Sequence, residues 1–156
     1  MATPKLQTGR ALEVITSDYC NLPFPQKIVT STNTLTAILP LLLDSNVDFR
    51  ALNVQAGDIV YNTTANLAAT VEVVLNQNAL QLNTQIFTSI GDTYTLYNGA
   101  NKDGAVLYVG GAGNLTIQTE AGDDITLVGV LKGTFIPVYT RKVYASTTAT
   151  NIVALW

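Results

Sequence analysis

Two parts of the sequence decide the fold: the stretch Gly57-Asp58-Ile59-Val60-Tyr61-Asn62-Thr63-Thr64 and the run at residues 80–97. Both consist of short segments rich in Val, Ile, Leu and Tyr, bounded by Gly, Asn or Asp. β-Branched and aromatic residues fit a half-buried pleated sheet, whereas Gly, Asn and Asp suit the turns between strands. This region therefore predicts four strands, at residues 58–62, 68–75, 79–82 and 94–97.

The same pattern continues on both sides of this region. Downstream, a loop at residues 98–104 (NGANKDG) precedes six further predicted strands, at residues 105–109, 114–119, 124–128, 134–139, 142–145 and 151–155. Upstream, residues 11–16 predict a strand, and residues 30–43 favour strand or extended structure over a short helical turn at Pro40. Short strands at near-regular spacing, without a helical stripe, predict an all-β fold of antiparallel sandwich or barrel modules.

The last six residues form an apolar strand, Asn151-Ile152-Val153-Ala154-Leu155-Trp156. An exposed strand of this kind is an aggregation hazard, and chain ends fray unless they are tied down, so we expect it to be paired within the sheet. The expected partner is the predicted strand at residues 142–145, in a hairpin. We also expect Trp156 to be at least half covered.

Composition narrows the possible functions. Hydrophobic residues make up 47% of the chain and charged residues only 12%, which is about half the usual charged share. A surface so poor in charge favours a protein covered by neighbours in an assembly. The net charge is −3 and the eight basic residues are scattered singly, so we expect neither nucleic-acid binding nor affinity for an anionic membrane.

Few residues are suited to catalysis. The chain has no His and a single Cys, Cys20, so it can form neither an internal disulfide nor a Cys-based metal cluster. Ser and Cys have no His to act as a base, and Cys20 is expected to be a buried packing residue. We therefore expect a non-enzyme with no cofactor and with no catalytic, cofactor-binding or metal-binding residues.

No export or membrane signal is evident. Residues 1–10 lack the apolar core of a signal peptide and are expected to form a flexible arm. The most apolar run, residues 38–43, is far too short to span a bilayer and contains Pro40. We expect a soluble product made without secretion through a signal-peptide route.

Two motifs resemble binding loops. Gly110-Gly111-Ala112-Gly113 follows an apolar strand, but a dinucleotide loop needs a helix next, and another strand is predicted there, so a hairpin turn is expected. Asp44-Ser45-Asn46-Val47-Asp48 opens like a calcium loop, but Phe49 and Gln55 stand where Gly and a bidentate Glu belong. A solvated turn before a buried Phe49 is the favoured interpretation.

Other motifs are equally ambiguous. The adjacent acids Asp123 and Asp124 would point to opposite faces of a strand, so a turn is favoured over a catalytic pair. The glycosylation patterns at residues 62–64 and 114–116 are expected by chance in a chain so rich in Asn and Thr. Six tyrosines fall in predicted strands and could form a glycan-binding face, but core or sheet-surface packing is favoured; they are Tyr61, Tyr94, Tyr97, Tyr108, Tyr139 and Tyr144.

Two resemblances to known families cover nearly all of residues 11–156. The first pattern is similar to a small β-barrel-like module common in structural proteins of tailed bacteriophages; it comprises Leu43-Asp44, Phe49, the stretch at 57–64, Ala68-Ala69-Thr70-Val71, Leu80-Gln81-Leu82, Ile86-Phe87 and Gly91-Asp92-Thr93-Tyr94. The second resembles the spike-base proteins of phages and gene transfer agents, which seat a fibre on the head; it comprises the residues at 14–23, 105–115, 122–127, 133–138 and 147–156.

The order of the two patterns implies an insertion. In the spike-base family, a segment like residues 14–23 closely precedes the Leu-Tyr-Val-Gly strand, whereas here roughly 80 residues intervene and contain the first pattern. We therefore expect an arm at residues 1–10, a spike-base-like module at residues 11–28 plus 99–156, and an inserted barrel-like module at residues 29–98.

The resemblances imply a non-enzymatic structural component of a tailed bacteriophage virion, made in the host cytoplasm and placed on the particle exterior. The expected role is a capsid decoration or cement protein, or the base of a head spike or fibre. The implied partners are the major capsid protein or other virion proteins, a fibre protein among them, and further copies in a homo-oligomer, a trimer first and a pentamer second. The alternatives are a receptor- or glycan-binding module for host adsorption and a neck or tail protein.

Overall fold

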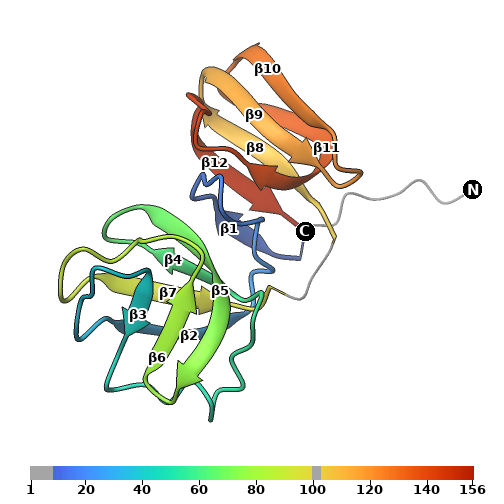
Figure 1. Ribbon diagram of the computed structural model, residues 1–156. Coiled ribbons are helices and arrows are strands. Elements are labelled where there is room, and N and C mark those ends of the chain that lie inside the picture. Colours follow the sequence, from blue (N-terminus) through green and yellow to red (C-terminus); the bar gives the residue numbers. More distant parts are fainter. Residues whose placement is uncertain (1–8, 100–102) are drawn as a thin grey trace, which may run out of the picture. The chain divides into compact units, whose positions relative to one another are not determined.

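A computed structural model describes residues 9–99 and 103–156 of the chain (Figure 1). These residues form twelve strands and no helix, and all strand pairings are antiparallel, so the predicted all-β fold of sandwich and barrel modules is confirmed. Within the described ranges no helix is long and apolar enough to cross a membrane. Most of the predicted arm, residues 1–8, and the middle of the loop at 98–104 lie outside the described residues.

The chain divides into two compact units, and one interrupts the other in sequence. The first consists of Met1–Val14 together with Asp103–Trp156, and the second of Ile15–Lys102. We refer to the second as the barrel unit and to the first as the sandwich unit.

The barrel unit contains six of the strands. They are β2 (Lys27–Thr32), β3 (Leu41–Leu43), β4 (Ile59–Asn62), β5 (Leu67–Asn76), β6 (Ala79–Leu82) and β7 (Thr93–Tyr97). Their order in the sheet is β2-β7-β4-β5-β6-β3. The segment that follows β2 pairs with β3. Leu35 forms a β-bridge with Leu43, and the Thr34 N–H donates to the Leu43 carbonyl at 2.8 Å. This contact joins the two edges of the sheet and closes the ring of strands.

Alternating apolar residues fill the inside of the ring. The core combines strand residues with residues of the connecting loops; among its fully buried side chains are Leu42, Phe49, Val60, Leu80, Leu82, Phe87, Tyr94 and Leu96. The rings of Phe87 and Tyr94 meet edge to face at 5.9 Å, a geometry that adds to the stabilisation from burial alone.

The outer face of β4 is also covered, which explains why all four residues of this strand are buried. The covering segment begins at Ile15 and is fixed by hydrogen bonds to β5 and to the residue after β6: Ser17 Oγ donates to the Ala68 carbonyl at 3.1 Å, and Asn83 Nδ2 donates to the Tyr19 carbonyl at 2.6 Å. Cys20, at the end of this segment, is buried.

These contacts place the unit boundaries differently from the expected ones. We assigned residues 11–28 to the module that continues at 99–156, but residues 15–28 cluster with the barrel unit. The division at residue 28 would also cut through β2, which pairs with β7 from Lys27 onward. Backbone bonds from Phe24 to Asn98 and from Asn98 to Gln26 hold the two ends of the barrel unit side by side.

The sandwich unit contains the other six strands. They are β1 (Ala11–Glu13), β8 (Ala105–Gly111), β9 (Gly113–Thr119), β10 (Asp124–Val130), β11 (Thr134–Val143) and β12 (Thr150–Leu155), in the order β1-β12-β8-β11-β9-β10. The long β11 pairs with β8 through its first half and with β9 through its second half, with register shifts on both sides of Thr140. The core side chains between these strands include Leu107, Val109, Leu115, Ile117, Ile136, Val143 and Ile152.

Three local predictions for this unit were wrong. Residues 142–145 do not form a separate strand, because β11 continues to Val143. The C-terminal strand is paired within the sheet, as expected, but its partners are β8 and β1, not residues 142–145. The turn at Gly110-Gly111-Ala112-Gly113 does not close a hairpin, because β11 lies between β8 and β9 in the sheet.

Glycine is required at this last turn by close packing. A Cβ on Gly113 would lie 2.5 Å from the Ala149 nitrogen, and one on Gly110 would lie 2.8 Å from the Asn151 carbonyl oxygen. The glycines thus allow the end of β8 and the start of β9 to pass close to the chain that leads into β12. Trp156 is more than half covered, as expected.

Candidate functional site: exposed apolar edges and a polar hollow

Strand β10 forms one edge of the sandwich unit. It is the last strand in the sheet order and, among residues 9–99 and 103–156, pairs with β9 alone, so in this part of the chain the backbone groups along its other side have no partner strand. The opposite edge, β1, has only three residues, whereas β10 has seven. An unpaired edge of this length is a template for strand addition by another chain.

Several side chains of β10 are apolar and at least partly exposed. Ile125 lies opposite the buried Ile117, and Leu127 opposite the buried Leu115, so both stand on the core side of the sheet. Nevertheless, Ile125 is 47% exposed, because β10 is the last strand in the sheet order. On the other side of the strand Val128 is 79% exposed. The edge therefore presents apolar side chains on both of its faces.

Charges do little to protect this edge. Asp124 is the only charged residue in the strand, and its Oδ1 accepts hydrogen bonds from Tyr144 Oη at 2.6 Å and from Gln118 Nε2 at 3.1 Å. The carboxylate is thus held against its own sheet. A register shift between Leu127 and Val130 bends the second half of the strand, which leaves residues 124–127 as the regular part of the edge.

A second apolar surface lies in the barrel unit, at the loop between β2 and β3. Ile38 is fully exposed, and Leu35, Leu39 and Ile90 are more than half exposed. The buried Asn33 organises this surface, because its Nδ2 donates to the Leu35 carbonyl at 3.2 Å and to the Ser89 carbonyl at 2.8 Å. These side chains therefore project from loops that are fixed to each other.

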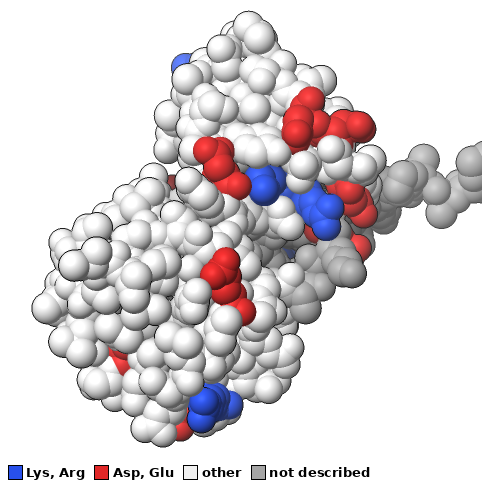
Figure 2. All heavy atoms as spheres, viewed as in Figure 1, with Lys and Arg blue, Asp and Glu red and all other residues white. Residues whose placement is uncertain are grey.

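The sequence did not reveal this loop surface. Residues 30–43 were expected to be strand or extended structure, yet between β2 and β3 the chain runs as a loop around Pro40. The signal available was Pro40 within an apolar run, since Pro excludes a central strand. The charge-poor composition, in contrast, is visible directly: on the face drawn in Figure 2, most atoms belong to uncharged residues.

The residues of the calcium-like motif serve the fold. Asp44 is buried, and its Oδ2 accepts a hydrogen bond from Tyr94 Oη at 2.7 Å. Asp48 Oδ1 accepts the N–H groups of Arg50 and Ala51 at 3.0 and 2.9 Å. The expected turn before a buried Phe49 is present, but it is not fully solvated, because Asp44 lies inside. Among the described residues, no group of three acidic or Cys side chains is placed to hold a metal ion.

The adjacent acids Asp123 and Asp124 lie at the end of a turn and at the start of a strand. Gly122 precedes them with a φ of 99°, and the Thr119 N–H donates to the Asp123 carbonyl at 2.9 Å. Asp124 is the first residue of β10. Asp123 and Asp124 therefore belong to a turn and to a strand, as their fold requires, and nothing in their geometry indicates a catalytic pair.

The tyrosines do not form one face. Tyr61, Tyr94 and Tyr97 are buried in the barrel unit, while Tyr139 of the sandwich unit is exposed. Burial raises the pKa of Tyr61 and of Tyr97, and burial followed by the hydrogen bond to Asp44 raises the pKa of Tyr94. The favoured interpretation, core packing, is confirmed for the three buried rings.

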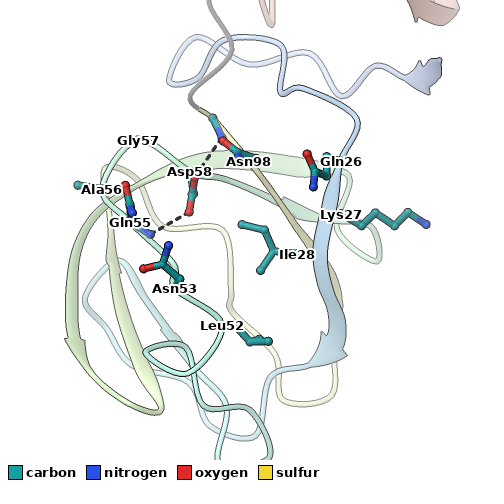
Figure 3. A pocket seen from close by; sticks show the side chains of 11 residues that line it. Gln26, Lys27, Ile28, Leu52, Asn53, Gln55, Ala56, Gly57, Asp58 and Asn98 are labelled. Atoms are coloured by element: carbon teal, nitrogen blue, oxygen red, sulfur yellow. Dashed lines mark hydrogen bonds between the residues drawn. The ribbon is translucent and has the colours of Figure 1, made fainter. Parts of the chain in front are cut away.

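One hollow in the barrel unit is built differently from these surfaces (Figure 3). It has a volume of about 450 Å³ and lies between the start of β2, the loop before β4 and the end of β7. Its lining includes amide side chains, one carboxylate, one Lys and the aliphatic side chains of Ile28, Leu52 and Ala56. Sequence reasoning missed it, because its residues come from three separated segments and match no motif.

Comparison with family models, with curated proteins and with solved structures finds no significant match to this chain.

Proposed function

We propose that this protein is a non-enzymatic structural component of a tailed bacteriophage virion, located on the head exterior as a capsid decoration protein or as the base of a spike or fibre. It acts by binding other proteins. The resemblance of both sequence patterns to phage structural modules supports this role. So do the nested order of the two units and the scarcity of charged residues.

The observation that carries the proposal is the open edge of β10. The exposed parts of Ile125, Val128 and the adjacent Leu131 together equal roughly two fully exposed apolar side chains. Covering them would contribute about 3–6 kcal/mol. Strand addition would add a ladder of backbone hydrogen bonds to this gain.

The size of this free energy indicates how the β10 edge is used. Association costs an estimated 4–15 kcal/mol of lost translational and rotational freedom, so one such contact gives weak pairwise binding. Repeated contacts in a symmetric oligomer or on a capsid lattice overcome this cost, because each later contact forms within an assembly that is already held together. We therefore propose a homo-oligomer, a trimer first and a pentamer second, seated on the major capsid protein or on another virion protein.

The test is a single Lys placed on the edge. Val128→Lys puts a charge where a neighbouring strand would pack, without changing a buried residue. Val73→Lys is the matched control, because Val73 is an exposed Val in β5, a strand that lies between β4 and β6 in the sheet order and not at its edge. Multi-angle light scattering above micromolar concentration measures the oligomer, and mass spectrometry of purified phage particles measures incorporation.

We expect the wild-type protein and Val73→Lys to associate and to enter the particle, and Val128→Lys to do neither. Unchanged incorporation of Val128→Lys would show that β10 is not the assembly edge. Absence of the wild-type protein from particles would refute the virion role itself.

A further inference from the structure

The hollow in the barrel unit has the dimensions of a small-molecule site. Its volume of about 450 Å³ falls within the range of roughly 300–1,000 Å³ that is usual for ligand pockets. Gln26 and Ile28 come from the start of β2, Leu52 and Asn53 from the loop before β4, and Asp58 from the residue that precedes β4. All of them belong to one compact unit.

Asp58 fixes the walls of the hollow. It is 6% exposed, its Oδ2 accepts the Gln55 N–H at 2.8 Å, and its Oδ1 accepts the Gly99 N–H at 3.1 Å. The carboxylate thus ties the loop before β4 to the chain that leaves β7, as the dashed lines in Figure 3 show. A side chain on Gly99 would collide with the carbonyl of Gly57, so glycine allows this close approach. The walls are therefore organised before any ligand arrives, which reduces the entropic cost of binding.

Hydrogen-bonding capacity remains open around the hollow. Each oxygen of a carboxylate can accept two hydrogen bonds, and each oxygen of Asp58 accepts one N–H from the chain. In the described part of the chain, the side-chain amides of Gln26 and Asn53 have no hydrogen-bond partner. Each amide provides two donors and one acceptor oxygen. In Figure 3, Ile28 lies between these polar groups and Leu52 lies below them, whereas Lys27 points away.

The polar and apolar groups of the hollow together determine which class of ligand can bind there. An apolar ligand would strip water from the amides and the carboxylate without replacing their hydrogen bonds, which is costly. An anion would be repelled by Asp58, the carboxylate in the lining, since Lys27 points outward. A metal ion would need further charged oxygen ligands, and the described residues offer no such group.

A neutral compound with several hydroxyl groups fits each feature. Its hydroxyls can donate to the open sites on Asp58 and exchange hydrogen bonds with the amides of Asn53 and Gln26, and its C–H face can pack on Ile28 and Leu52. We propose that the hollow is a binding site for a neutral saccharide unit. This site is separate from the β10 edge, so the proposed assembly role does not depend on it. It also replaces the tyrosine face considered from the sequence.

The test is an NMR titration of the full-length, ¹⁵N-labelled protein with the methyl glycosides of glucose, galactose, mannose and N-acetylglucosamine. We expect at least one of them to produce saturable shifts at the amides of Gln55 and Gly99, with a dissociation constant on the order of millimolar. Methyl glucuronide, which carries a carboxylate, is expected to bind more weakly because of Asp58.

A pair of matched variants locates the site. Asn53 has a φ of 57°, and Asn66, in the turn between β4 and β5, has a φ of 56°. Glycine adopts this backbone conformation readily, so Asn53→Gly and Asn66→Gly each remove one exposed amide with little strain. Loss of one hydrogen bond corresponds to about a fivefold weaker affinity. We expect this loss for Asn53→Gly and for Gln26→Ala, and no change for Asn66→Gly.

Absence of saturable shifts with all four neutral glycosides would overturn the inference. So would shifts at residues away from the hollow, or equal affinity in Asn53→Gly and the wild-type protein.

Discussion

The substitution Asn62→Ala tests how the barrel unit is held together. Asn62 is the last residue of β4 and is completely buried. Its Nδ2 donates to the Ile86 carbonyl at 2.7 Å and to Asp92 Oδ2 at 2.9 Å. Its Oδ1 accepts the N–H groups of Thr64 and Ala65 at 3.1 and 2.9 Å. One side chain thus joins the end of β4 to the loop between β6 and β7.

The expected loss follows from these four bonds. A net contribution of about 0.5–1.5 kcal/mol per hydrogen bond gives roughly 2–6 kcal/mol, and the buried Asp92 carboxylate and Ile86 carbonyl would each also lose a donor. We therefore expect Asn62→Ala to lower the free energy of unfolding by about 4 kcal/mol. This is a large fraction of the ~5–15 kcal/mol that stabilises a typical domain.

Urea unfolding, followed by the near-ultraviolet circular dichroism of tyrosine, measures the change. With a slope of about 2 kcal/mol/M, the midpoint should fall by roughly 2 M. Asn76→Ala is the control, because Asn76 is exposed and its Oδ1 accepts a single N–H, from Asn78 at 2.8 Å. A midpoint for Asn62→Ala within about 0.5 M of the control would refute the reasoning.

Three further outcomes are expected. Burial raises the pKa of Tyr61, Tyr94 and Tyr97, so the stability that these neutral side chains give the folded protein is complete below pH ~10 and is lost as the pH rises further. Each tyrosine lowers the free energy of unfolding by up to about 1.4 kcal/mol per pH unit above that value. Absorbance at 295 nm should show the three tyrosines ionising together with unfolding. A fragment of residues 15–99 should fold cooperatively by itself, since its ends are hydrogen-bonded to each other; a non-cooperative melt would show that the two units share one core. Deleting residues 151–156 removes the strand between β1 and β8 and should abolish the native fold of the sandwich unit, whereas a melting temperature equal to that of the full chain would contradict the pairing.

Local patterns predicted most of the strands. The strand at residues 79–82 has the predicted bounds, and the stretch that begins at Gly57 contains β4 where it was expected. Such predictions succeed because alternation and turn residues act within a few positions of each other. The all-β class followed from the same local information.

Long-range partners could not be predicted in this way. The C-terminal strand pairs with β8, about 45 residues earlier in the chain, although residues 142–145 were nearer in sequence. The register shifts around Thr140 let β11 continue where a break was predicted. Neither feature leaves a signal in the periodicity of one strand, because both depend on the neighbouring strands.

The polar groups of the candidate sites were hidden for a related reason. Asn62 attracted attention only as part of a glycosylation pattern, yet it is a buried link between loops. Asp58 was predicted to be part of a strand, and its contact with Gly99 spans 41 positions. Side chains that connect distant loops are identified only once the fold brings those loops together.

The most direct test of the proposed function is a cryo-electron microscopy map of phage particles purified from cells that produce this chain. We expect density for both β units on the outside of the head, in a symmetric cluster, with the β10 edge covered by a neighbouring protein. A map in which every exterior protein is assigned to another chain would contradict the virion role. A map that shows this protein with β10 facing solvent would contradict the proposed assembly edge.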